Sequence, residues 1–285
     1  MSAKHIKSLG VVGSGQMGAG IAQVGAVAGL RVVLHDQDEA ALKAAVERID
    51  RKLQAQAEKG HLTQADKAAA LSGIRTTADL REVADCDFVV EAVTERLAIK
   101  LQIFEALDSA CREAAILASN TSSLSITRIG AATRRPERVV GMHFMNPVPA
   151  MKLVEIVVGQ ATSKATVDVT AALADRLGKV PVVAHDLPGF ISNRLLMPMI
   201  NEAIFAFYEG VGSRDDIDTV MRLGMNHPMG PLALADFIGL DTCLSIMEIL
   251  QQGFGDSKYR PCPLLRRMVD AGMLGRKSGR GFYDY

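Results

Sequence analysis

The distribution of apolar and polar positions changes once along the chain. Up to residue 187, short β-branched apolar runs alternate with stretches in which apolar residues recur every three or four positions. From residue 188 onward only the helical spacing remains. Because alternating strands and helices are typical of a mostly parallel sheet covered by helices, we predict a doubly wound α/β domain over residues 1–187 and an all-α domain over residues 188–285.

The first domain's strands are predicted from short apolar runs bounded by turn residues, and its helices from longer periodic stretches. Beyond residue 36, strands are expected at residues 87–93, 115–119, 139–142, 152–158 and 180–184, and helices at 38–59, 63–73, 97–110 and 164–177. In the second domain, helices are expected at residues 189–209, 213–224, 231–252 with a break near Gly239, and 262–273. Ligands of doubly wound sheets bind at the carboxyl ends of the strands, so the functional site is expected there.

A glycine-rich turn follows the first strand. It reads Gly13-Ser14-Gly15-Gln16-Met17-Gly18 and leads into a helix that Gly29 ends; a second β-branched run then ends in Asp36. In this strand, turn, helix and strand context, the glycines permit a tight bend, close approach of a pyrophosphate and close packing of the helix on the sheet. The turn therefore predicts a Rossmann-like dinucleotide site formed by residues 13–18.

Asp36 distinguishes between the two nicotinamide dinucleotides. It stands 23 positions after Gly13 (36 minus 13), near the spacing of about 20 expected for the acid that binds the ribose hydroxyls. A carboxylate there accepts a hydrogen bond from the 2′-hydroxyl and repels a 2′-phosphate, and the next residues, Gln37 and Asp38, supply no cation. The predicted cofactor is NAD rather than NADP.

The two helices at residues 38–59 and 63–73 form a hairpin longer than a simple crossover requires. Gly60 closes the first helix, and Thr63 is the expected N-cap of the second. An outgrowth beside the cofactor suggests a clamp for the substrate. Lys52 and Lys59 on its first helix either contact a substrate phosphate or belong to a solvated face, and the pattern alone leaves both interpretations open.

A histidine stands at the carboxyl end of the strand at residues 139–142. His143 opens a loop that contains Pro147 and Pro149, and the next strand carries Glu155 among apolar residues. A buried carboxylate is costly unless it is paired, and these neighbouring strands can bring Glu155 to the imidazole. A histidine such as His143, taken alone, is more often a hydrogen-bonded structural residue. A His–Glu pair beside NAD, in contrast, could take a proton from an alcohol as hydride leaves its carbon.

Several long segments of the chain resemble one family of enzymes. They are GSGQMGAGIAQ, FVVEAVTE, SNTSSLSIT, GMHFMNPVPAMKLVEIV, DLPGFISNRLLMPMINEA, NHPMGPLALADFIGLD and the terminal GRKSGRGFY. The chain is similar nearly end to end to the L-3-hydroxyacyl-CoA dehydrogenases, and most like the short-chain bacterial 3-hydroxybutyryl-CoA dehydrogenases. The resemblance implies NAD-dependent, reversible oxidation of a short-chain L-3-hydroxyacyl-CoA to the 3-oxoacyl-CoA.

The resemblance also implies roles for individual residues. His143 would be the general base with Glu155 orienting it, and Ser122 and Asn193 would donate hydrogen bonds to substrate oxygens. Lys52 and Lys59 would approach coenzyme A, although the family often has a small hydroxyl residue at the position of Lys52. The residues that would line the NAD site are Asp36, Glu95, Lys100, Ser122, Asn146 and Lys277.

Less specific interpretations of these residues remain. Ser122 could cap a helix, Asn193 could be an ordinary polar residue, and Glu95 with Lys100 could be a surface pair at the start of a helix. Lys277 lies in a glycine-rich tail. For the whole chain, the alternatives are a dehydrogenase of a free hydroxy acid or sugar acid on the same fold, or a non-catalytic, crystallin-like dinucleotide-binding protein.

Composition restricts the partners. Lys plus Arg and Asp plus Glu both number 32, so no overall field attracts nucleic acid or an anionic membrane. The N-terminus has no signal-like apolar segment and no stretch is long enough to span a membrane, so we expect a cytoplasmic protein.

The helical domain is too apolar to bury its surface alone, which predicts a homodimer formed through residues 188–285. Four scattered cysteines, Cys86, Cys111, Cys243 and Cys262, indicate reduced thiols and no metal site.

Overall fold

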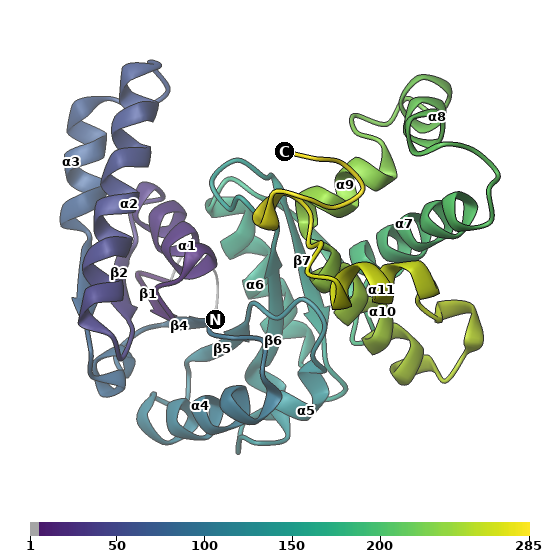
Figure 1. Ribbon diagram of the computed structural model, residues 1–285. Helices are drawn as coiled ribbons and strands as arrows, with labels where there is room; N and C mark the ends of the chain where they lie inside the picture. Colours follow the sequence, from purple (N-terminus) through teal and green to yellow (C-terminus); the bar gives the residue numbers. More distant parts are fainter. Residues whose placement is uncertain (1–5) are drawn as a thin grey trace. The chain divides into compact units, whose positions relative to one another are not determined.

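The computed structural model describes residues 6–285. The chain folds into two compact units. The first unit ends at Asp186 and the second covers Leu187–Tyr285. Figure 1 shows the strands and helices of the first unit and the helices of the second. The predicted architecture, a Rossmann-like α/β domain with a helical hairpin followed by an all-α domain, is confirmed.

An eight-stranded sheet forms the first unit, in the order β3-β2-β1-β4-β5-β6-β7-β8. Neighbouring strands are parallel except β6 and β7, which are antiparallel. The strands are β1 (Ser8–Val12), β2 (Arg31–His35), β3 (Ile74–Thr77), β4 (Phe88–Glu91), β5 (Ile116–Ser119), β6 (Val139–Phe144), β7 (Leu153–Val158) and β8 (Val180–His185). β1, β4, β5 and β6 are buried along their whole length, as expected for strands covered on both faces.

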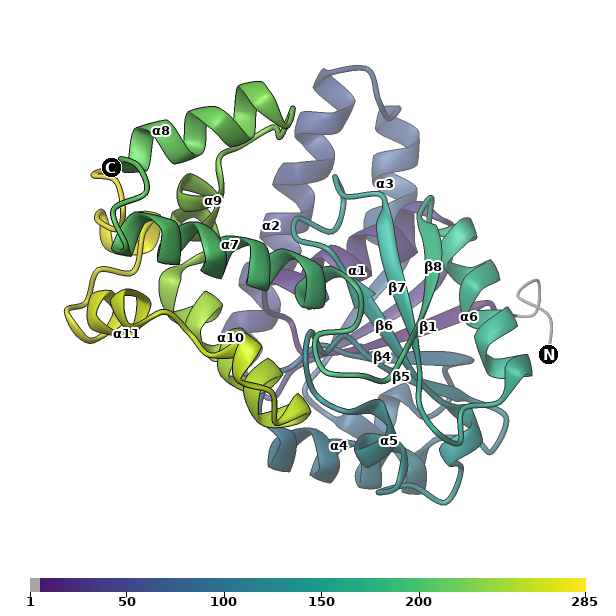
Figure 2. The ribbon, with the colours of Figure 1, turned by 90° about the vertical axis from the view of Figure 1, so that its right-hand side faces the viewer.

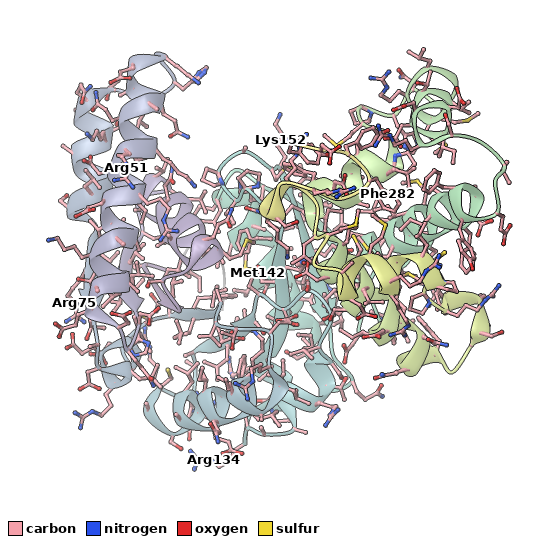
Figure 3. All side chains as sticks on the ribbon, viewed as in Figure 1. Arg51, Arg75, Arg134, Met142, Lys152 and Phe282 are labelled. Carbon is pink, nitrogen blue, oxygen red and sulfur yellow. The ribbon has the colours of Figure 1, made fainter. Side chains whose placement is uncertain are left out.

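Helices cover both faces of this sheet. They are α1 (Gln16–Val27), α2 (Glu39–Glu58), α3 (Gln64–Ser72), α4 (Leu97–Ala110), α5 (Ile126–Gly130) and α6 (Lys164–Arg176), with 3-10 turns η2 (Leu80–Val83) and η3 (Pro136–Arg138). α1 and α6 lie on one face and α4 and α5 on the other (Figure 2). Met142 of β6 is completely buried in the interior of this unit (Figure 3).

The helical hairpin consists of α2 and α3. Asp38 caps α2, and Thr63 caps α3 in a capping box with Asp66, in which each side chain accepts a hydrogen bond from the other's backbone N–H. Leu42, Ala45, Ile49 and Leu53 bury one face of α2 against the core, whereas Arg51 is exposed on the hairpin (Figure 3). The hairpin thus presents a polar face beside the sheet.

The sequence did not predict two short elements of this unit, β3 and α5. β3 is a four-residue edge strand of sequence IRTT with two exposed positions, so it lacks the apolar run that marks a buried strand. α5 is a helix of only five residues capped by Ser125. Both are too short to show a period in the sequence.

The second unit is entirely helical. Its helices are α7 (Ser192–Tyr208), α8 (Arg214–Thr219) continued by the π-helical turn η4 (Val220–Gly224), α9 (Pro231–Ile238), α10 (Leu240–Phe254) and α11 (Pro263–Asp270), with 3-10 turns η5 (Ser257–Tyr259) and η6 (Arg276–Ser278). Gly239, with φ of 104°, separates α9 from α10 at the predicted break. Asp236 of α9 is buried and accepts hydrogen bonds from the backbone N–H groups of Phe282 and Tyr283, 2.9 Å each, which fastens the C-terminal segment to the helices.

None of the helices in residues 6–285 has the length and apolar character needed to span a membrane.

Candidate active site

The glycine-rich turn between β1 and α1 has the geometry of a phosphate cradle. Gly13 has φ of +101°, and a Cβ there would lie 2.7 Å from the carbonyl oxygen of Ala92. A Cβ at Gly18 would lie 1.8 Å from the carbonyl oxygen of Gly13, so a side chain would push α1 away from the turn. Gly15 faces open space at the start of α1, where the helix offers unpaired backbone N–H groups to an anion. The turn therefore fits a dinucleotide pyrophosphate.

Asp36 lies directly after β2 and contacts this turn. Its Oδ2 accepts hydrogen bonds from the backbone N–H and the hydroxyl of Ser14, both 2.8 Å, and its Oδ1 accepts one from the backbone N–H of Asp38. Burial opposes ionisation, but the bonds from Ser14 outweigh it and lower the pKa of Asp36 below its ordinary value. Asp36 is therefore a fixed carboxylate, as needed for binding ribose hydroxyls.

A pocket of about 230 Å³ lies next to Asp36. Its walls come from the ends of β1 and β2, from η2, from the loop after β4 and from α4, and its apolar side chains are Val12, Leu80, Val93, Ile99 and Ile103. An apolar slot beside a carboxylate that could accept hydrogen bonds from a ribose suits the flat face of an adenine ring. Together with the glycine turn, the pocket fits the adenosine part of NAD.

His143 and Glu155 face each other across the antiparallel pair of β6 and β7. They are register partners, and Nδ1 of His143 lies 2.8 Å from Oε2 of Glu155. The side chain of His143 is 10% exposed and that of Glu155 is 2% exposed. When Glu155 is ionised, this contact places a proton on Nδ1 and leaves Nε2 as the acceptor. The pair thus has the geometry of an oriented base at the carboxyl end of β6.

Ser122 lies in the loop after β5, held by Glu95. Oε1 of Glu95 accepts hydrogen bonds from the Ser122 backbone N–H at 2.8 Å, from the Ser122 hydroxyl at 3.2 Å and from the hydroxyls of Thr121 and Ser123. Burial opposes ionisation, but the charge of Lys100 and these bonds lower the pKa of Glu95. Glu95 therefore organises the whole loop. The sequence did not predict that the hydroxyls of Thr121 and Ser123 also bind Glu95.

Lys100 is not a surface residue, contrary to the surface-pair interpretation. Its side chain is 1% exposed, with Nζ 2.6 Å from Oε1 of Glu91 and 3.4 Å from Oε2 of Glu95. Glu91, at the end of β4, is fully buried, and sequence reasoning did not single it out. An acid in an otherwise apolar strand was the available signal, the same one that identified Glu155.

Asn146 links the loop after β6 to the glycine turn. It lies in the loop after β6, and its Oδ1 accepts a hydrogen bond of 2.9 Å from Nε2 of Gln16. Gln16 is the first residue of α1. The contact brings the glycine turn and the loop after β6 together within the first unit. Met17, the residue after Gln16, packs against the core.

Lys52 and Lys59 lie in the second half of the hairpin's first helix. Lys52 is half-buried on α2 and Lys59, its C-cap, is exposed; neither forms an ion pair within residues 6–285. Lys67 of α3, in contrast, pairs with Asp50 at 2.7 Å. The charges of Lys52 and Lys59 are thus available to a ligand, and their contact with one stays a prediction.

The last two predicted residues belong to the helical unit. Asn193 lies in the first turn of α7 and is 9% exposed. Lys277 lies in η6, and its ammonium group pairs with Asp241 of α10. Their predicted contacts with substrate and NAD remain predictions.

Comparison with known proteins gives consistent matches over the whole chain. The family model described as 3-hydroxyacyl-CoA dehydrogenase, NAD binding domain, matches residues 8–187, and the model described as the C-terminal domain of the same enzyme matches residues 189–285. A probable 3-hydroxybutyryl-CoA dehydrogenase of Bacillus subtilis is 57% identical over 99% of this chain and 98% of its own length. A 3-hydroxybutyryl-CoA dehydrogenase of Bradyrhizobium diazoefficiens is 54% identical over 98% of this chain and 96% of its own.

A solved structure agrees with these sequence matches. The crystal structure of (S)-3-hydroxybutyryl-CoA dehydrogenase from Ralstonia eutropha superimposes with a TM-score of 0.97 at 49% identity, and the match covers 98% of this chain and 99% of that one.

Proposed function

Because the chain belongs to the 3-hydroxyacyl-CoA dehydrogenase family and is an NAD-dependent dehydrogenase, we propose that its substrate is a short-chain L-3-hydroxyacyl-CoA such as 3-hydroxybutyryl-CoA. It oxidises this substrate reversibly to the 3-oxoacyl-CoA. The names of its relatives support the short acyl chain. The observation that carries the chemistry is the buried contact of 2.8 Å between His143 and Glu155.

The proposed roles follow from that contact. Bound NAD accepts the hydride from C3 of the substrate. Nε2 of His143 takes the hydroxyl proton at the same time, because Glu155 holds the other ring nitrogen protonated. The carboxylate also stabilises the imidazolium that forms, so its effect is greatest in the transition state. In the reverse direction the imidazolium returns the proton to the 3-oxo oxygen.

Ser122 and Asn193 are proposed to position the substrate oxygens. The Ser122 hydroxyl lies on the loop that Glu95 fixes, which supports a precisely placed donor. Asn193 contributes an amide from the start of α7. Lys52 and Lys59 are proposed to attract the phosphates of coenzyme A, supported by the lack of ion-pair partners for either lysine among residues 6–285.

An acyl-CoA substrate can be separated from a free hydroxy acid by one comparison. NADH oxidation is measured with acetoacetyl-CoA and with free acetoacetate at equal concentrations. We expect turnover of the thioester and a far smaller kcat/KM for the free acid, because remote binding energy of the carrier orients the reacting carbon. Equal kcat/KM values would favour a free-acid dehydrogenase, and no turnover of either would favour a non-catalytic protein.

We further propose a homodimer formed through the helical unit. An apolar pocket of about 470 Å³ on this unit lies among α7, α8 and η4, and several side chains of this region are exposed. They include Val211 (77%), Leu223 (77%), Met225 (60%) and Val220 (57%). Exposed apolar side chains beside an apolar pocket are typical of a protein interface.

The cytoplasm is the proposed location. All four cysteines are free, buried thiols, and burial raises the pKa of Cys86 to about 12 and that of Cys111 to about 11. Such thiols are unreactive packing residues, as expected for a protein of a reducing compartment.

A further inference from the structure

Three ionisable side chains, those of Glu91, Glu95 and Lys100, lie together between the end of β4 and the start of α4, and two of them are buried. The side chains of Glu91 and Lys100 are 0% and 1% exposed, with 2.6 Å between Oε1 and Nζ. Removing charges from water costs several kcal/mol per ion, and a well-packed apolar pair is often as stable. A buried ion pair is therefore weak support for a role in stability alone.

Glu91 is held rigidly at both carboxylate oxygens. Its Oε1 accepts hydrogen bonds from Nζ of Lys100 and from the backbone N–H of Val93 at 2.7 Å, and its Oε2 accepts one from the hydroxyl of Ser119 at 2.7 Å. These donors belong to β5, to α4 and to the loop after β4. The carboxylate thus fixes the otherwise flexible lysine side chain at one point on the sheet.

Lys100 transmits this anchoring to the Ser122 loop. Its Nζ lies 3.4 Å from Oε2 of Glu95, and the other oxygen of Glu95 accepts the hydrogen bonds from Thr121, Ser122 and Ser123. Glu95 itself is partly exposed, with 36% of its side chain accessible. Without a fixed cation behind it, Glu95 would be held toward the loop only by these hydrogen bonds, for which water competes at a partly exposed carboxylate.

We propose that Glu91 and Lys100 are positioning residues, which hold Glu95 against residues 121–123 and thereby aim Ser122 at the substrate. The inference rests on the proposed function, because Ser122 has its role there. It assigns Lys100 an action through Glu95, and it adds Glu91 as the anchor.

The first variants remove the anchor and the cation. Glu91→Gln keeps the size of the side chain but removes its charge, and Lys100→Met removes the ammonium group. We expect Glu91→Gln to lower kcat for acetoacetyl-CoA reduction by roughly 10- to 100-fold, since a displacement of about 1 Å can cost about 10²-fold in rate. The double variant should lose no more than Lys100→Met alone, because the two residues act in series.

A readout that is independent of turnover is hydrogen exchange of the protein without ligand. The backbone N–H of Ser122 donates to Glu95, so Glu91→Gln should speed exchange in a peptide covering residues 119–125. The matched control is Asp108→Asn. Asp108 is 4% exposed and pairs with Arg135 at 2.6 Å in the same unit, but it contacts none of the proposed site residues. The Asp108→Asn variant should lower Tm without changing kcat or the hydrogen exchange of the peptide that covers residues 119–125.

The outcomes separate the proposals. If Glu91→Gln, like the control, lowers only Tm, the cluster is structural and the inference is wrong. If Glu91→Gln does not fold, Ser119→Ala replaces it as the test, because this variant removes one hydrogen bond to Glu91. Faster exchange of the peptide and a loss of kcat smaller than that expected for Glu91→Gln support the inference. Unchanged exchange and kcat overturn it. If the unmodified protein does not reduce acetoacetyl-CoA, the proposed function fails, while the exchange result still tests the anchoring.

Discussion

The orientation of His143 depends on one register partner. In the antiparallel pair of β6 and β7, His143 stands opposite Glu155, so both side chains emerge on one face of the sheet. A shift of the register by one residue would send the carboxylate to the opposite face. The reversal of strand direction after β6 is thus what places Glu155 beside His143, whereas the other strand neighbours in this sheet are parallel.

Asp36 gives a prediction about cofactor choice. Its carboxylate is fixed by Ser14 and ionised, so it should bind ribose hydroxyls and repel a 2′-phosphate. We expect kcat/KM for NADH to exceed that for NADPH by a large factor. Asp36→Ala should narrow this difference, mainly by weakening the binding of NADH. Equal values for the two cofactors in the unmodified protein would contradict this assignment.

At the scale of the element, the hairpin provides a prediction about the carrier. Lys52 and Lys59 are seven residues apart, two turns of helix, so they lie on one side of α2. Changing both to Ala should raise KM for acetoacetyl-CoA and leave KM for NADH nearly unchanged. Lys43→Ala, an exposed lysine nine residues before Lys52 on the same helix, is the control. An unchanged acyl-CoA KM in the double variant would place both lysines on a solvated face.

Asp108 ties α4 to the segment before η3 and predicts a dependence of stability on pH. Burial opposes ionisation, but the hydrogen bonds from Arg134 and Arg135 outweigh it and lower the pKa of Asp108 below the ordinary value of 3.8. A depressed pKa stabilises the fold above the unfolded-state pKa and ceases to do so as pH falls through the folded-state value. The Tm difference between the unmodified protein and Asp108→Asn should therefore be constant near neutral pH and shrink below pH 3.8. The same difference at pH 3 and pH 7 would contradict this.

Local sequence signals predict the fold better than they predict the contacts among Glu91, Lys100 and Glu95. The glycine turn, the helix caps and the buried strands are local patterns, and they were predicted within a few residues. β3 was missed because its pairing with β2, not its own apolar content, makes it a strand. The link from Glu91 through Lys100 to Glu95 joins residues on two elements to a loop near residue 122. No spacing within one element encodes such a link.

For the whole molecule, the exposed apolar residues of the helical unit predict the oligomeric state. Sedimentation velocity should give a dimer of about twice the chain mass of 30.5 kDa at micromolar concentration. Leu223→Glu with Val220→Glu should shift it to monomer, because charges would be buried in the interface. Val183→Glu, on the exposed edge strand β8, is the control. A monomer for the unmodified chain would contradict the proposed interface.

Turnover by His143→Ala tests whether the pair is catalytic. In the proposed mechanism His143, oriented by Glu155, transfers the proton in acyl-CoA dehydrogenation. Reduction of acetoacetyl-CoA by NADH should fall in kcat by ~10²–10⁴-fold, with NADH affinity, measured by fluorescence titration, nearly unchanged. Glu155→Gln, which keeps the shape but loses the charge, should give a smaller yet large loss. A folded His143→Ala protein that binds NADH and turns over within about tenfold of the unmodified enzyme would show that the pair is structural.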